Sequence, residues 1–203
     1  FSLSKFIVCT DAGLSSERNR KFNNFGGRCF ITTQSIKKLK KDLRQWCLEP
    51  TGWHLKDSLD TYDISRLEDT AKNRSKLFYK QLYVEGNDGK RDIDFDQTLI
   101  VTYSLKYRNY QQQIRNQQIL RAIKAIDTEP KRIDKHSQND YRRFIKKTSI
   151  TAYGECAANK IYEIDQDAVQ EEAQYDGFYA VYTNLDDDPS EIAAVNQGRW
   201  EIE

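Results

Sequence analysis

The sequence predicts an α/β fold in which helices pack on a layered sheet. Three patterns along the 203 residues support this prediction. Residues 1–55 alternate between short apolar runs and helical periodicity, a hairpin pattern occupies the middle of the chain, and a strand followed by a helix ends it. Alternation of strands with helices is typical of a sheet that helices cover.

The amino-terminal part reads as strand, helix, strand, helix. Apolar runs of strand length cover residues 5–10 and 28–33. Ser15 and Ser16 are suitable caps for a short helix over residues 17–25, which two glycines end. Ser35 precedes a second, amphipathic helix with lysines on one face. The apolar face of this helix consists of Ile36, Leu39, Leu43, Trp46 and Cys47.

The remaining elements follow from turns and caps. Residues 77–84 and 93–104 are predicted strands joined through Gly86-Asn87-Asp88-Gly89, a hairpin pattern. Asp188 is a predicted N-cap with Pro189 at the first helical position and Glu191 at the capping-box position. We expect the last helix to run from there to the end of the chain. The other predicted elements are a helix over 105–126, a strand over 161–164, an acidic helix over 165–173 and a strand over 178–183.

Charge is nearly balanced in total, at +1, but it is separated along the chain. Two stretches, 17–44 and 106–147, are rich in Lys and Arg, whereas 163–191 contains neither residue type. This separation favours a face for a polyanion, although ordinary solvated helix faces give the same pattern. Without an apolar run long enough to span a bilayer, we expect a cytoplasmic protein with no membrane partner. The four cysteines lack metal-binding spacings, so we expect reduced thiols.

Candidate functional residues lie at both ends of the chain. Asp11 follows a predicted strand, and loops at strand ends often hold functional groups on a rigid scaffold, although Asp also simply caps turns. Asn196, Arg199 and Glu203 are spaced three and four apart and therefore share one helical face. Such an Arg and Glu suit a phosphodiester and a divalent cation, or form a surface salt bridge. The local pattern alone favours the surface salt bridge.

Three blocks of this sequence resemble insertion-sequence DDE transposases, in particular the insertion-sequence-4 superfamily. The blocks are Asp11-Ala12-Gly13-Leu14, Tyr175-Asp176-Gly177-Phe178 leading to Thr183-Asn184, and Asn196-x2-Arg199-x3-Glu203. Tyr103-Ser104-Leu105-Lys106 before a Gln/Arg-rich helix is also similar, so the resemblance covers nearly the whole chain. Asn196 stands where the family has Tyr. The closing Lys and the first catalytic Asp of the family have no counterpart in this chain.

The resemblance implies an incomplete ribonuclease-H-like catalytic core, formed by residues 1–55 and 175–203 and interrupted by a large β-containing insertion over 56–174. It implies metal-dependent DNA cleavage and strand transfer, with Asp11 and Glu203 as catalytic ligands of a two-metal site for Mg²⁺ or Mn²⁺. Arg199 and Asn196 would contact DNA near the cleaved bond. A basic set would follow the DNA backbone: Lys37, Lys38, Lys40, Lys41 and Arg44. Core packing is the default expectation for Trp53 and the tyrosines of the insertion, and stacking on an unpaired base is the alternative.

We therefore expect transposon-end and target DNA as partners, and a second copy of the parent protein in the assembly. We also expect the chain to be an internal fragment that is inactive alone, because the first Asp is absent. Two alternatives stay open at this point. One is a non-catalytic DNA-binding or oligomerisation module derived from a transposase, and the other is a different ribonuclease-H-like nuclease.

Overall fold

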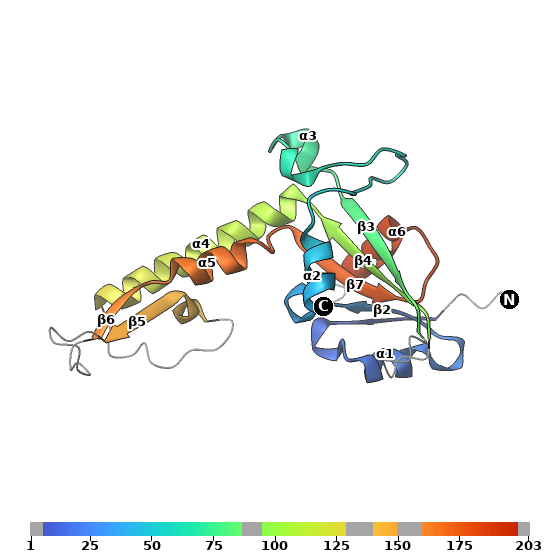
Figure 1. The fold of residues 1–203 in the computed structure, drawn as a ribbon, viewed down its shortest axis with the longest axis horizontal. Helices are drawn as coiled ribbons and strands as arrows, with labels where there is room; N and C mark the ends of the chain where they lie inside the picture. The colour runs from blue at the N-terminus through green and yellow to red at the C-terminus, as the bar shows by residue number, and fades with distance from the viewer. Residues whose placement is uncertain (1–5, 87–94, 129–139, 150–159, 199–203) are drawn as a thin grey trace. The chain divides into compact units, whose positions relative to one another are not determined.

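The computed structural model describes residues 6–86, 95–128, 140–149 and 160–198 (Figure 1). Contacts between residues divide the chain into two compact units, which are described separately. The first unit comprises residues 1–107 and 177–203, and the second comprises residues 108–176.

A five-stranded mixed sheet is the centre of the first unit. Its strands are β1 (Ile7–Thr10), β2 (Cys29–Thr33), β3 (Phe78–Val84), β4 (Gln97–Tyr103) and β7 (Phe178–Thr183). The spatial order is β1-β2-β7-β4-β3, so β1 and β3 are the two edge strands (Figure 1). β1 and β2 are parallel, and each of the other neighbouring pairs is antiparallel. The sheet combines a parallel pair with an antiparallel three-stranded part.

Helices cover both faces of this sheet. On one face lie α1 (Glu17–Asn24) and α2 (Lys41–Leu48), and the opposite face is covered by α6 (Pro189–Gly198) (Figure 1). Arg20 of α1 lies over the ring of Tyr182 at 4.3 Å, which fixes α1 to the first face. The other short elements of this unit are α3 (Ala71–Arg74) and the 3-10 turns η1 (Ala12–Leu14), η2 (Phe25–Gly27), η3 (Ile36–Lys38) and η4 (Ile64–Arg66).

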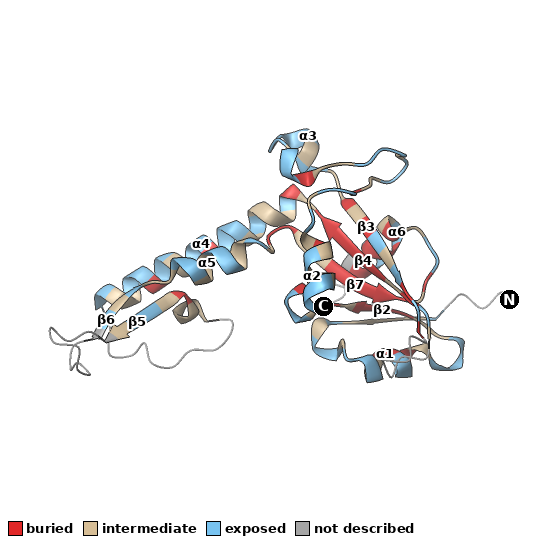
Figure 2. Cartoon of the chain, in the orientation of Figure 1, coloured by how far each residue is buried: buried red, intermediate tan, exposed pale blue. Residues whose placement is uncertain are grey.

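Two apolar clusters hold the helices to the sheet, and Figure 2 shows buried residues concentrated in its central strands. Under α6 the cluster consists of Ile31, Ile100, Val181, Leu185 and Ile192. On the opposite face the fully buried Trp53 packs against Tyr103 and Phe178, with ring centroids 6.0 and 5.8 Å away. Each fully buried large apolar side chain contributes roughly 1.5–3 kcal/mol to the free energy of unfolding.

The second unit is a helix packed beside a small hairpin. α4 (Leu105–Thr128) begins in the first unit and continues into the second, which also holds β5 (Ile145–Ser149), β6 (Lys160–Ile164), α5 (Gln166–Ala173) and the turn η6 (Tyr141–Phe144). β5 and β6 are antiparallel. Within this unit Arg115 donates two parallel hydrogen bonds to the Asp176 carboxylate, both of 2.6 Å. Arg143 binds the Glu172 carboxylate in the same two-pronged way, at 2.6 and 3.0 Å.

The mixed α/β class predicted from the sequence is confirmed, and most elements lie where the patterns placed them. Ser16 caps α1 by accepting a hydrogen bond from Asn19 N–H at 3.2 Å. The prediction of one helix following Ser35 is wrong. The chain instead makes the η3 turn, becomes extended at Leu39 and Lys40, and starts α2 at Lys41. The strand β5 was not predicted from the basic stretch that contains it.

The two units differ in extent from the predicted core and insertion. β3 and β4 fall within the predicted insertion, yet β4 pairs with β7 in the five-stranded sheet. The contacts between residues therefore place the division after Tyr107, within the first turn of α4. The division into a family core and an insertion stays a prediction.

Candidate functional site

Asp11 follows the last residue of β1, at the carboxyl end of the parallel β1–β2 pair. Its Oδ1 accepts a hydrogen bond from Gly13 N–H at 2.9 Å, and its carbonyl accepts one from Leu14 N–H at 3.1 Å. A Cβ at position 13 would lie 3.1 Å from Asp11 Oδ1, so glycine gives the carboxylate room to fold over the η1 turn. Asp11 is thus an exposed carboxylate with a fixed backbone setting at a strand end.

Strand alternation assigns Asp11 to the face of the sheet that α6 covers. Ile7 and Cys9 of β1 pack against the cluster that contains Ile192 of α6. Because successive residues of a strand point to opposite faces, Asp11 continues the series of Ile7 and Cys9. On β2, Thr33 continues the same face at the neighbouring position. The strand ends of β1 and β2 therefore direct Asp11 and Thr33 to the side of α6.

A polar link connects Thr33 to the end of α6 through the hydroxyl of Tyr179. The Thr33 and Tyr179 hydroxyl oxygens are 2.6 Å apart, and Asn196 Nδ2 donates to the Tyr179 oxygen, also at 2.6 Å. Tyr179 lies near the start of β7, which runs antiparallel to β2. The carboxyl end of β2, the start of β7 and the last turn of α6 therefore meet at the same end of the sheet, where these strands begin or finish.

Asn196 itself lies in the protein interior, with none of its surface exposed. Its Oδ1 has no hydrogen-bond partner within the part of the chain that the structure describes. Although the sequence predicted a DNA contact for Asn196, this placement makes it a residue that positions α6. Arg199 and Glu203 lie outside the described residues, so the predicted approach of Glu203 to Asp11 stays a prediction.

The predicted metal site is represented by Asp11 alone in the described structure. Among residues 6–86, 95–128, 140–149 and 160–198, no group of three or more His, Cys, Asp or Glu side chains is placed to hold a metal ion. The carboxylate of Asp11 is a hard oxygen donor, the type that Mg²⁺ and Mn²⁺ prefer. Asp11 therefore fits one ligand of such an ion.

The predicted DNA-binding cations lie on η3 and α2. The four lysines are exposed, and Arg44 is half-buried, with Nη1 3.5 Å from the carbonyl oxygen of Lys37. Because the chain is extended at Leu39 and Lys40, the cations do not form one continuous helical face. The basic set is Lys37 and Lys38 on η3, Lys40 before α2, and Lys41 and Arg44 within α2.

Trp53 is fully buried and donates its indole N–H to the Glu49 carbonyl at 2.9 Å. A buried ring of this kind has no free face for a nucleic-acid base. Core packing, the default expectation for this residue, is confirmed.

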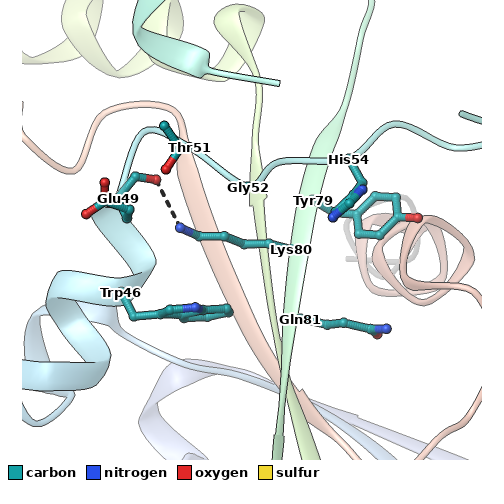
Figure 3. A pocket seen from close by; sticks show the side chains of 8 residues that line it. All are labelled: Trp46, Glu49, Thr51, Gly52, His54, Tyr79, Lys80 and Gln81. Atoms are coloured by element: carbon teal, nitrogen blue, oxygen red, sulfur yellow. Dashed lines mark hydrogen bonds between the residues drawn. The ribbon is translucent and has the colours of Figure 1, made fainter. Parts of the chain in front are cut away.

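Lys80 was not singled out from the sequence, although it is the one charged residue of β3. The side chain is only 5% exposed, and Nζ donates to the Glu49 carbonyl at the end of α2, at 3.0 Å (Figure 3). Nζ also lies over the rings of Trp46 and Trp53, at 4.9 and 4.6 Å from their centroids. Burial, which penalises the charged form, lowers the pKa of Lys80 to about 8. The ammonium thus stabilises a helix carboxyl terminus at a cost in desolvation.

Tyr179, whose hydroxyl links Thr33 to Asn196, was also not singled out from the sequence. It lies in a strand of mostly apolar residues, and no local pattern distinguishes its hydroxyl from those of neighbouring tyrosines.

Comparison with known proteins gives no match for this chain among protein-family models, curated proteins or solved structures. Within the described residues, no helix has the length and apolar character needed to cross a membrane.

Proposed function

We propose that this chain belongs to the catalytic region of a DDE-type DNA transposase and that Asp11 is one of its catalytic carboxylates. The observation that carries the proposal is the position of Asp11 directly after β1, where strand alternation assigns it to the face that α6 covers. The hydrogen bonds among Thr33, Tyr179 and Asn196 hold the last turn of α6 at the end of the sheet where β2 finishes. Glu203 follows Asn196 by seven positions, which is the spacing of one helical face.

The fold that accompanies this proposal is an incomplete ribonuclease-H-like core. The parallel pair β1–β2, with a carboxylate after its first strand, supports this assignment. The antiparallel strands β3 and β4 extend the sheet beyond β7 and belong to the proposed insertion, together with the second unit.

Two divalent cations, Mg²⁺ or Mn²⁺, would supply activation of water or a 3′-hydroxyl and charge stabilisation at the leaving oxygen. Asp11 and Glu203 would hold them. Asp11 already uses Oδ1 to accept the Gly13 N–H, which orients the carboxylate before any ion binds. The exposed setting of Asp11 leaves the carboxylate accessible to a bulky substrate such as DNA.

The substrate class is DNA, which the basic set on η3 and α2 would bind through phosphates without reading sequence. Arg199 would contact a phosphate close to the cleaved bond. Asn196, being buried, would act on this reaction only by positioning the helix that precedes Arg199 and Glu203.

Metal binding at Asp11 is tested by Mn²⁺, whose unpaired electrons broaden nearby NMR signals. We expect the amide signals of Gly13 and Leu14 to broaden in the natural chain and to stay sharp in Asp11→Asn. Asp60→Asn, which changes an exposed carboxylate in a different loop, is the control and should keep the broadening. Equal broadening in Asp11→Asn would remove Asp11 from the metal site.

The reaction is tested with labelled plasmid DNA and Mg²⁺. We expect this chain alone to leave DNA intact, because it carries two of the three carboxylates that the proposal requires. Mg²⁺-dependent nicking by the purified chain that Asp11→Ala abolishes would contradict this expectation and favour a different ribonuclease-H-like nuclease. Binding of DNA without Mn²⁺ broadening at Gly13 would favour a non-catalytic DNA-binding module.

A further inference from the structure

The edge strand β3 presents an open row of backbone hydrogen-bonding groups. Tyr79 exchanges two backbone hydrogen bonds with His54, at 2.8 and 2.9 Å, on the side of β3 away from β4. Because backbone groups of a strand alternate between its two sides, those of Gln81 and Tyr83 face the same outer side as Tyr79. Within the described residues, neither Gln81 nor Tyr83 has a backbone partner on that side.

A single residue pair, His54 with Tyr79, is present at this edge where a sixth strand would lie. His54 pairs with Tyr79 in antiparallel sense, so a continuing strand would place Gly52 opposite Gln81. Gly52 instead adopts a φ of 78°, a left-handed conformation that does not continue a strand. The residues between α2 and His54 therefore do not pair with Gln81. Among the described residues, no strand therefore pairs with the outer side of β3 from Gln81 onwards, and an added strand there would continue the pairing of His54 with Tyr79.

Two hollows flank this open edge and meet at Gln81. The first has a volume of about 390 Å³, and Figure 3 shows the residues that line it, with Trp46 and Lys80 on one side of β3 and His54 and Tyr79 on the other. The second, of about 490 Å³, lies between β3 and the loop before α6. It is lined by Gln81, Tyr83, Thr98, Leu185, Asp186, Asp187, Asp188 and Pro189.

The second hollow carries negative charge. Three consecutive aspartates form its wall, and Asp188 is held by the Ser190 amide at 2.8 Å as α6 begins. The chain already places one basic side chain beside this wall, because Lys56 Nζ lies 3.2 Å from Glu191 on α6. Charge complementarity therefore favours a basic occupant and disfavours a nucleic acid.

We propose that the β3 edge binds an extended basic segment of a partner polypeptide, which adds an antiparallel strand opposite Gln81 and Tyr83. Strand addition of this kind takes affinity from backbone hydrogen bonds and specificity from alternate side chains. Directly opposed residues of antiparallel strands point to the same face. The residues of the partner that bond to Gln81 and Tyr83 thus direct their basic side chains towards the aspartates. This interaction is separate from the proposed DNA chemistry and does not depend on it.

The test uses the whole chain and a fluorescent nine-residue peptide in which lysine alternates with threonine. We expect this peptide to bind, and a peptide with glutamate in place of lysine to bind at least tenfold more weakly. Methylation of the lysine backbone nitrogens should abolish binding, because those N–H groups face β3, whereas methylation of the threonine nitrogens should leave it unchanged. Exchange of the Gln81 and Tyr83 amide hydrogens should slow at least tenfold, with no change at Leu82, which already faces β4.

Variants and self-association provide the controls. Asp186→Asn should weaken the lysine peptide several-fold, and Asp60→Asn should not. The proposal is overturned by absence of binding at millimolar peptide, by equal binding of the glutamate peptide, or by binding without protection of Gln81 and Tyr83. Concentration-dependent dimers in sedimentation that protect the same two amides would assign the edge to a second copy of the chain and also overturn it.

Discussion

Asn196 donates a hydrogen bond of 2.6 Å to the hydroxyl of Tyr179, and this bond joins the last turn of α6 to the start of β7. The same hydroxyl lies 2.6 Å from the hydroxyl of Thr33. One phenol group therefore connects two strands and a helix at the end of the sheet where Asp11 follows β1. We regard this link as the element that holds the candidate site together within the described structure.

Tyr179→Phe tests the link, because it removes the hydroxyl and keeps the ring. The Asn196 amide then loses its partner in the interior, and we expect the free energy of unfolding to fall by about 1–3 kcal/mol. Urea unfolding followed by circular dichroism measures the change. Val195→Ala, at an exposed position of the same helix, is the control and should change stability by less than about 0.5 kcal/mol. Equal stability of Tyr179→Phe and the natural chain would show that the link carries no net energy.

The sequence predicted elements that depend on local signals. Phe178–Thr183 is a strand in both the prediction and the structure, because an apolar run follows the turn at Asp176-Gly177. The predicted helix after Ser35 failed at Leu39 and Lys40, where helical periodicity continues although the backbone is extended. Periodicity reports which residues are apolar, and it does not report where tertiary packing interrupts a helix.

Local sequence patterns did not predict the features that depend on contacts between distant segments. The order β2-β7-β4 and the bond from Asn196 to Tyr179 join segments whose pairing no periodicity specifies. Asp11 was singled out correctly as a residue at a strand end, and the packing of Ile7 and Cys9 indicates the face to which strand alternation assigns it. The burial of Asn196 was not predictable from its spacing, because spacing on a helix defines a shared face and does not show what covers that face.

The depressed pKa of Lys80 makes stability depend on pH. The group titrates near 8 in the folded chain and near 10.5 when unfolded, so the unfolded state binds more protons between these values. Stability therefore rises as pH increases through this window, by roughly 2–3 kcal/mol over its full width. Burial raises the pKa of the Cys47 thiol to about 12, which has the opposite effect above pH 9. The comparison is best made between pH 7 and pH 9.

Lys80→Met isolates this contribution. The variant keeps an unbranched side chain between the two tryptophan rings and lacks the titrating group. We expect urea unfolding to show a smaller gain in stability from pH 7 to pH 9 in Lys80→Met than in the natural chain. A gain of the same size in both proteins would mean that Lys80 stays fully charged throughout this range.

The buried ion pair of Arg115 and Asp176 should contribute far more than an exposed one. Their side chains are 10% and 7% exposed, so Asp176→Ala leaves an uncompensated guanidinium in the interior of the second unit. We expect a loss of about 3–5 kcal/mol in the free energy of unfolding. The matched control is Asp69→Ala, which breaks the more exposed pair with Arg74 and should cost less than about 1 kcal/mol. Similar losses in the two variants would contradict the reasoning from burial.

The exposed lysines of η3 and α2 are the predicted source of any DNA affinity in this chain. Each phosphate contact contributes about −0.9 to the slope of log affinity against log salt concentration. Reversing Lys37, Lys38, Lys40 and Lys41 to glutamate should therefore flatten this slope and weaken binding to every DNA sequence alike. Fluorescence anisotropy with labelled duplexes, measured over a salt series, determines both quantities.

The control for this experiment is a reversal of basic charge in the second unit. Lys146→Glu with Lys147→Glu changes two residues of β5 in the second unit and should leave the affinity and the slope nearly unchanged. If that pair of changes flattens the slope and the reversal at η3 and α2 does not, the DNA-binding surface belongs to the second unit. The lysines of η3 and α2 would then be ordinary solvated charge, the other interpretation that the charge pattern allowed.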